Sequence, residues 1–312
     1  MEMGMFRKKL KKILLFFLVI VLALFVFDQV HTRIFQKKVD QYIEENPPMI
    51  SWIDDDGFQS FYTKLYPLAK KHNISLASAF ISNRVHNGKT FYTVASGKEM
   101  LADGMEIINH GYFHDKNYKP HQMSQRKMEY DYTRSQEINE KHGFNSRIHV
   151  YPFGSMKGYS KRLAKKHFDY AFSLKNGLVP RPFDPYSINR VSIQDSTTSS
   201  YLPLEDLYQI MDEGAENSSW LVLVSHVDQF CPYEEDYHES FIKYAKQKGY
   251  EFVTLEEALD RYKIFERDWY DGIKLEIGHI LIKLYQKFIY KIPLEEDINC
   301  YIHMDDDYFP QN

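Results

Sequence analysis

Short apolar segments alternate with longer amphipathic ones through the central part of the chain. The apolar segments have the length of buried strands, and they cover residues 49–53, 76–81, 105–109, 148–151, 170–174, 188–193, 221–225 and 252–255. The amphipathic segments between them predict helices, among them residues 59–72, 124–141, 204–213 and 235–248. Strands that alternate with helices are typical of a parallel sheet. The pattern therefore predicts an α/β fold with a parallel β/α barrel, complete or partly opened.

The first 30 residues follow a different pattern. A basic cluster comes first, with Arg7, Lys8, Lys9, Lys11 and Lys12. Residues 13–27 then run without a polar side chain. This run is shorter than the roughly 20 apolar residues of a typical spanning helix, so a cleaved signal peptide is an alternative. Residues 25–28 (FVFD) lack the small residues of a cleavage site, and we predict an uncleaved signal anchor.

This N-terminal pattern also predicts the location of the rest of the chain. Positive charge beside a membrane span stays in the cytoplasm, so we expect residues 1–12 to be cytoplasmic and residues 13–30 to cross the cell membrane once. Residues 31–47 are predicted to form a polar stalk or a short helix. The main domain, residues 48–263, would then lie outside the cytoplasm. Residues 264–312 are predicted to form a helical extension and an acidic tail. The helical extension would pack on the barrel or on the membrane surface.

Composition narrows the choice of partners. The net charge is −4, and without Glu2 and the five residues of the N-terminal basic cluster it is −8, so the remaining chain is acidic. Such a domain has no electrostatic reason to bind nucleic acid. The two cysteines, Cys231 and Cys300, could form one disulfide but are too few for a disulfide framework. The sequence gives no indication of a protein partner.

Three adjacent carboxylates follow the first predicted strand, in the segment Ile53-Asp54-Asp55-Asp56-Gly57. Negative charges this close repel one another, and a bound cation or a catalytic role would explain why they are kept together. A turn or a helix N-cap would use the same residue types. This segment alone leaves both interpretations open.

Two histidines follow another predicted strand, in the segment NHGYFH at residues 109–114. His110 and His114 are four residues apart, so a helical turn would bring them onto one face. Two neutral imidazoles and a carboxylate are a common ligand set for zinc, with one position left for water. Such a pair is weak evidence alone, but the strand ends of a β/α barrel all lie on its catalytic face.

Two further segments lie at predicted strand ends. Residues 220–225 form an apolar strand that ends at His226, which could act as a general acid over the same face or make an ordinary loop hydrogen bond. Tyr151, Pro152, Phe153 and Gly154 form a rigid turn after another strand. Proline and glycine are equally common in turns without a catalytic role.

In order and context these segments resemble the NodB-type polysaccharide deacetylases of carbohydrate esterase family 4. The resemblance covers about residues 47–260 and implies a distorted (β/α) barrel of seven to eight parallel strands. Residues 53–57 look like the TFDDG motif of that family, with Asp54 in the place of its phenylalanine.

The resemblance also implies roles for the residues at the strand ends. Asp55 would be the catalytic base and Asp56 a metal ligand, with His110 and His114 as the remaining ligands. The implied metal is zinc, which cobalt, nickel or manganese could replace. His226, in a match to the L-x-H motif, would be the general acid.

The third motif of the family differs in this chain. Tyr151, Pro152, Phe153 and Gly154 match its turn, whose backbone would help to form the oxyanion hole. Val150 stands where many members have an arginine that pairs with the catalytic aspartate. The fourth motif of the family has no clean match, but Arg190 begins or ends a strand at about the right place and could supply the missing charge.

These features predict a metal-dependent hydrolase that removes N-acetyl groups from a cell-surface or exported polysaccharide with N-acetylglucosamine-type sugars. The missing arginine and the additional Asp54 leave a second hypothesis, an inactive glycan-binding domain of the same fold. A third hypothesis is an amidohydrolase acting on a small non-sugar amide, for which a membrane anchor has no evident use. The sequence leaves peptidoglycan, poly-N-acetylglucosamine and capsular or secondary wall polysaccharides open as substrates.

Overall fold

The chain forms two compact units, Met1–Asn46 and Pro47–Asn312. The computed structural model describes residues 2–114, 122–156 and 159–268, and the further residues 270–272, 274 and 277. The C-terminal extension predicted for residues 264–312 therefore lies almost entirely outside the described residues, as do the acidic tail and Cys300.

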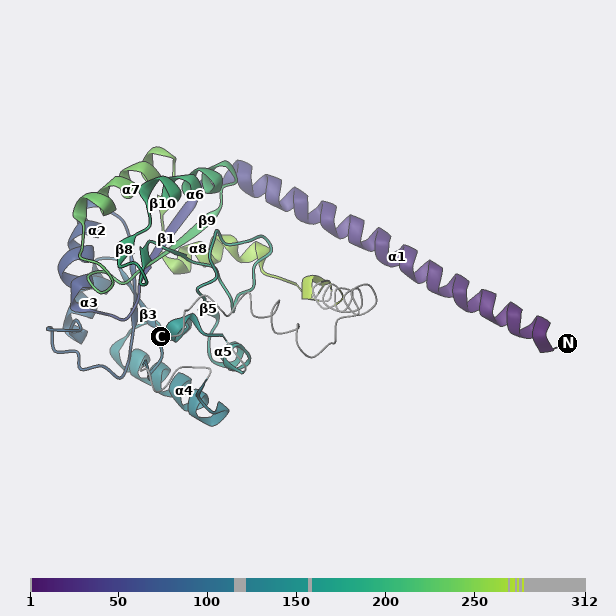
Figure 1. Cartoon of the computed structure of the whole chain (residues 1–312), viewed down its shortest axis with the longest axis horizontal. Helices are drawn as coiled ribbons and strands as arrows, with labels where there is room; N and C mark the ends of the chain where they lie inside the picture. The colour runs from purple at the N-terminus through teal and green to yellow at the C-terminus, as the bar shows by residue number, and fades with distance from the viewer. Residues whose placement is uncertain are drawn as a thin grey trace. The chain divides into compact units, whose positions relative to one another are not determined.

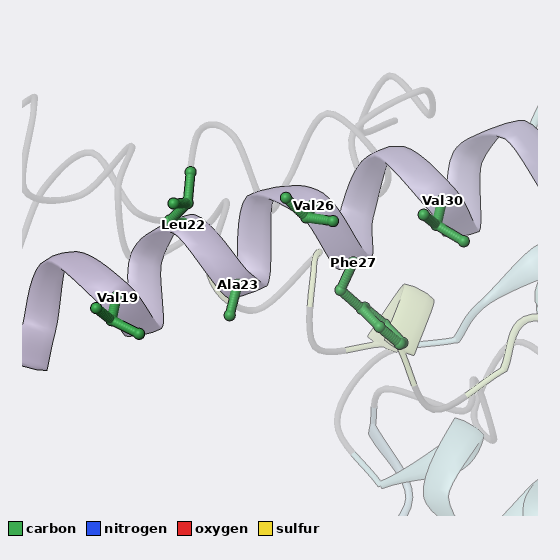
Figure 2. Close-up of a pocket in the computed structure, with 6 residues that line it drawn as sticks. All are labelled: Val19, Leu22, Ala23, Val26, Phe27 and Val30. Carbon is green, nitrogen blue, oxygen red and sulfur yellow. The ribbon is translucent and has the colours of Figure 1, made fainter.

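The first unit is one helix, α1 (Glu2–Glu45). The segments predicted as an anchor and as a stalk are thus parts of one continuous helix. Figure 2 shows one face of α1, where apolar side chains recur at helical spacing: Val19, Leu22, Ala23, Val26, Phe27 and Val30. In the described part of the chain, no helix is both long enough and apolar enough to cross a membrane.

The second unit is built around a parallel sheet. Its strands are β1 (Met49–Asp54), β2 (Ala77–Phe80), β3 (Glu106–Asn109), β4 (Ile148–Val150), β5 (Tyr170–Phe172), β6 (Val191–Ser192), β9 (Trp220–Ser225) and β10 (Glu251–Phe252). They are hydrogen-bonded in the order β5-β4-β3-β2-β1-β9-β6, and β10 also pairs with β1. Every one of these pairs is parallel. Each strand lies within or overlaps an apolar segment named above, so the predicted parallel α/β fold is confirmed.

The two ends of this strand order approach each other after β5. Phe172 at the end of β5 forms a parallel bridge with Ile188, which lies shortly before β6. The N–H of Ser173 donates to the Ile188 carbonyl at 2.9 Å. The sheet is therefore a parallel-strand half-barrel, consistent with the predicted barrel of seven to eight strands.

Helices surround the strands (Figure 1). They are η1 (Phe61–Leu65), which continues into α2 (Tyr66–His72), then α3 (Val94–Ala102), α4 (Gln125–His142), α5 (Ser160–His167), α6 (Leu204–Glu216), α7 (Glu235–Gln247) and α8 (Leu255–Tyr262). The helices predicted at α2, α4, α6 and α7 are confirmed. Helices α3, α5 and α8 were not among the named predictions, and neither was the small hairpin of β7 (Gln194–Asp195) and β8 (Ser200–Tyr201).

The central strands β1 and β9 bring the predicted site together. All six residues of each strand are buried, as continuous apolar runs in a parallel sheet should be. The two strands pair along their whole length, with Asp54 opposite Ser225. Because both strands run in the same direction, Asp55 and His226 leave the sheet side by side.

Candidate metal and catalytic site

Most of the predicted site residues lie at the carboxyl ends of strands in the parallel sheet. Asp55 and Asp56 follow β1, His110 and His114 follow β3, the turn of residues 151–154 follows β4, and His226 follows β9. Arg190 lies directly before β6 and joins them from the other side of β9. The parallel strand order thus gathers segments that are far apart in the chain.

Asp56, His110 and His114 converge on one point. Asp56 Oδ1 lies 3.4 Å from His110 Nε2 and 3.3 Å from His114 Nε2. One ligand atom from each residue lies within 4.8 Å of the others. Asp56 Oδ1 is buried and has no hydrogen-bond partner among the described residues. A cation between these atoms would give that oxygen a partner, so the donor set fits a divalent metal with nitrogen and oxygen ligands.

Asp56 occupies an unusual backbone conformation. Its φ is 78°, and Gly57 follows with a φ of 70°. Residues other than glycine rarely adopt this left-handed region, and such strain is concentrated at functional sites. The turn brings the Asp56 carboxylate to the two histidines immediately after the strand ends.

His110 is held with one nitrogen toward Asp56. Its Nδ1 lies 2.9 Å from the carbonyl oxygen of Val150. A carbonyl only accepts, so Nδ1 carries the proton and Nε2 faces the cluster, as in many metal-binding histidines. Burial lowers the pKa of His110, but the carboxylates of Asp55 and Asp56 outweigh burial and raise it. The site therefore favours positive charge at this position.

The segment between the two histidines is not helical, so the helical turn that their spacing would allow is not what brings them together. Gly111 has a φ of 76°, and side chains accept the N–H groups of all three intervening residues. Gly111 donates to Asn109 Oδ1 at 2.8 Å, and Tyr112 and Phe113 donate to Asp131 Oδ1 at 3.1 and 2.5 Å. Asp131, on α4, was missed by the sequence analysis because nothing in its local pattern connects it with the histidines.

Asp55 forms a buried ion pair with Arg190. Arg190 Nη1 donates to Asp55 Oδ1 at 2.8 Å, and its Nε donates to the Ser173 carbonyl at 2.9 Å. Asp55 is 3% exposed and Arg190 is 1% exposed. Burial raises the pKa of Asp55, but the charges of Arg190, His110 and His226 outweigh it and lower the pKa below its usual value. Arg190 thus supplies the charge that Val150 cannot.

His226 faces the same aspartate. Its Nε2 lies 3.9 Å from Asp55 Oδ2, and its ring packs against Phe230, with 4.4 Å between centroids. Burial lowers the pKa of His226, against the raising effect of Asp55 and Asp56. The backbone N–H of His226 donates to Gln194 Oε1 at 2.6 Å. Gln194 lies on the unpredicted hairpin, and no sequence signal pointed to it.

The turn of residues 151–154 forms one side of the site. Tyr151 is buried, and its hydroxyl donates to a backbone carbonyl at 3.1 Å. A short 3₁₀ segment runs from Pro152 to Gly154, and Phe153 within it has a φ of 57°. The Phe153 ring lies 4.3 Å from the His114 ring. Gly154 is required because a Cβ there would lie 2.6 Å from the Leu174 side chain.

Comparison with known proteins agrees with this geometry. Residues 43–170 match the model of the polysaccharide deacetylase family. This part of the chain is similar to the polysaccharide deacetylases. No curated protein matches its sequence. The matched residues include the segments that carry Asp55, Asp56, His110 and His114 and the turn after β4.

Solved structures of one protein, PdaC, share the fold of the second unit. The peptidoglycan deacetylase PdaC from Bacillus subtilis is 18% identical, with a TM-score of 0.50 over 70% of this chain and 93% of that one. A variant of PdaC is 16% identical, with a TM-score of 0.50 over 75% and 98% of the two chains. The Streptococcus pyogenes deacetylase PplD is 22% identical, with a TM-score of 0.42, and the match covers 45% of this chain and 62% of PplD.

Proposed function

We propose that this protein is a metal-dependent hydrolase that removes N-acetyl groups from a cell-surface or exported polysaccharide containing N-acetylglucosamine-type sugars. One observation carries the proposal. A carboxylate held by Arg190 and facing His226 lies beside a cluster of one aspartate and two histidines. Amide hydrolysis needs a base, an acid and a means of stabilising the carbonyl oxygen, and these groups supply them.

Asp56, His110 and His114 would hold the metal ion. One oxygen and two imidazole nitrogens suit zinc, and cobalt, nickel or manganese could take the same ligands. When bound, the ion would polarise the acetamide carbonyl and lower the pKa of a water molecule.

The other groups of the site would move the protons. Asp55 Oδ2 would accept a proton from the attacking water, while Arg190 holds Oδ1 and keeps the carboxylate ionised. His226 Nε2 would donate a proton to the sugar nitrogen as the C–N bond breaks. The products are acetate and a free amine. The backbone near Phe153, in the turn of residues 151–154, would stabilise the carbonyl oxygen as it gains negative charge.

We also propose that residues 13–30 are a signal anchor that places the deacetylase domain outside the cell membrane. The proposal is supported by the basic cluster directly before an apolar run. A tether of this kind would keep the site within reach of a wall polymer or of a polysaccharide leaving the cell.

The test measures acetate release from chitooligosaccharides, β-1,6-linked N-acetylglucosamine oligomers and peptidoglycan, each with and without a chelator. Peptidoglycan is included because PdaC, which shares the fold, is a peptidoglycan deacetylase. We expect release that the chelator abolishes and that added zinc restores. The variant His110→Ala should release no acetate and bind less than one equivalent of zinc.

The outcomes separate the three hypotheses. Release that survives both the chelator and His110→Ala would contradict metal dependence. A protein that binds one equivalent of zinc but acts on none of these polymers would favour a small amide as substrate. A protein that binds no zinc and releases no acetate from these substrates would favour the glycan-binding domain.

A further inference from the structure

Asp54, the last residue of β1, is a buried carboxyl that the proposed mechanism does not use. Its side chain is 0% exposed. Its Oδ2 accepts a hydrogen bond from the Ser225 hydroxyl at 2.7 Å and another from the Val227 N–H at 2.9 Å. Both donors flank His226. Asp54 therefore connects the end of β1 to the turn that carries the histidine.

The turn that carries His226 is held at three consecutive residues. Ser225 and Val227 donate to Asp54, and the N–H of His226 itself donates to Gln194 Oε1 at 2.6 Å. The Ser225 hydroxyl also accepts the indole N–H of a β1 tryptophan at 2.9 Å. Since this hydroxyl donates in one direction and accepts in another, its orientation is fixed.

We propose that Asp54 is a positioning residue for His226, a role that rests on the proposed function. Without its carboxyl, the Ser225 hydroxyl and the Val227 N–H would lose their acceptor in a buried site, and the turn would relax toward other partners. His226 Nε2 lies 3.9 Å from Asp55 Oδ2, so a shift of the turn moves the acid away from the base. A misplacement of about 1 Å can cost on the order of 100-fold in rate.

This role accounts for the aspartate that stands at position 54 where the TFDDG motif has a phenylalanine. A phenylalanine at this position would fill the space but accept neither hydrogen bond. Asp54 accepts both, and in doing so it orders the segment on which the proposed general acid lies. The additional aspartate is then a part of the active site's support and is no sign of an inactive domain.

The test compares variants of the full-length chain. Asp54→Leu removes the acceptor at similar size, whereas Asp54→Asn keeps an acceptor oxygen. Ser51→Ala is the control, because Ser51 is also buried on β1 but its hydroxyl donates to the Val253 carbonyl and accepts the Trp220 indole N–H at the start of β9, away from the turn. We expect Asp54→Leu to lower kcat about 10- to 100-fold at unchanged KM and zinc content. Asp54→Asn should recover most of that loss, and Ser51→Ala should match the wild type.

A wild-type kcat in Asp54→Leu, or equal losses in the leucine and asparagine variants, would overturn the proposal. If the leucine variant does not fold, Ser225→Ala is measured in its place, since it removes one of the two donors to Asp54. A lower kcat at unchanged KM then supports the positioning role, and an unchanged kcat overturns it.

Crystal structures of the variants give a readout that does not depend on acetate release. His226 should move away from Asp55 in Asp54→Leu and stay in place in Asp54→Asn. If the wild type releases no acetate while His226 moves in this way, the positioning role stands and the proposed function fails. If His226 stays in place in the leucine variant, the positioning role fails.

Discussion

Asp55 shows how neighbouring charges decide the state of a single residue. A carboxyl this deeply buried would ordinarily hold its proton, because burial disfavours the charged form. Arg190 reverses that preference, with His110 and His226 adding to its effect, and the pKa of Asp55 lies below its usual value. The carboxylate is thus ionised at neutral pH, which a general base requires.

We predict that Asp55→Asn lowers kcat by roughly 100-fold or more, because an amide cannot accept the proton. Zinc content should stay at the wild-type value, since Asp56, His110 and His114 are unchanged. The measurement is acetate release together with zinc content. Asp103→Asn, at an exposed ion pair with Lys70, is the control and should keep full activity. An active Asp55→Asn enzyme would show that another group is the base.

At the scale of elements, helix α4 supports the turn between the two proposed metal ligands. The turn has no helical hydrogen bonds of its own. Asp131, which is 2% exposed on α4, accepts two of its N–H groups. The geometry of His110 and His114 thus depends on a carboxylate from a separate element, as metal ligands commonly depend on outer hydrogen bonds.

We predict that Asp131→Ala raises the Kd for zinc by about 10-fold or more, because it leaves two N–H groups of the turn without their acceptor. Asp131→Asn keeps an oxygen at this position and should have a smaller effect. Zinc affinity is measured by competition with a chromogenic chelator. The control is Glu137→Ala, on the same helix but at an exposed ion pair with Arg134. Equal zinc affinity in the Asp131→Ala and control proteins would refute the supporting role.

A second contact between elements joins α7 to β1. The His238 ring of α7 stacks on Trp52 of β1, with 5.5 Å between centroids and 7° between planes. His238 is 0% exposed, and burial lowers its pKa to about 4. The ring is therefore neutral in the folded protein at neutral pH.

This burial predicts a loss of stability in acid. An unfolded histidine has a pKa of about 6.5, so below that pH the unfolded chain binds a proton that the folded chain refuses. The stabilisation is fully present above pH ~6.5 and is lost as the pH falls toward 4, by an amount on the order of 3 kcal/mol. In His238→Phe, which keeps the stack on Trp52, the unfolding free energy should fall less between pH 7 and 5. Urea unfolding at several pH values tests this, and parallel curves for both proteins would contradict it.

At the scale of the whole molecule, the strand order assembles the site. Asp54 and Ser225 are 171 residues apart in the chain yet share a hydrogen bond, because β1 and β9 are neighbours in the sheet. Arg190 reaches Asp55 from the far side of β9 by the same topology. The proposed base, its arginine and the proposed acid therefore come from three separate parts of the chain.

The two units of the chain lead to a prediction about location. We expect the full-length protein to float with lipid vesicles in a density gradient and a fragment that begins at Gln41 to remain at the bottom. Both proteins should release acetate from soluble oligosaccharides with similar kcat, since the site residues all lie after Pro47. A full-length chain that does not bind vesicles would refute the proposed anchor.

The sequence by itself determined the strands and pointed to the main residues that the structure brings together at their ends. Apolar runs specified β1 and β9 because a strand buried on both faces is largely apolar. The acidic and histidine segments were informative because each directly follows such a run. Short helices such as α5, with eight residues, give too few turns for a periodic pattern to distinguish them.

The tertiary structure decided how these residues are held. Asp131 and Gln194 accept N–H groups of the site from elements remote in sequence, and no local pattern encodes such a pairing. It also decided that the His110–His114 segment is a supported turn with a left-handed glycine and not the helical turn that the spacing would allow. Hydrophobic periodicity is a local property that the sequence displays directly. The partner of a buried polar group is set by which strands and helices become neighbours, and only the folded chain fixes that.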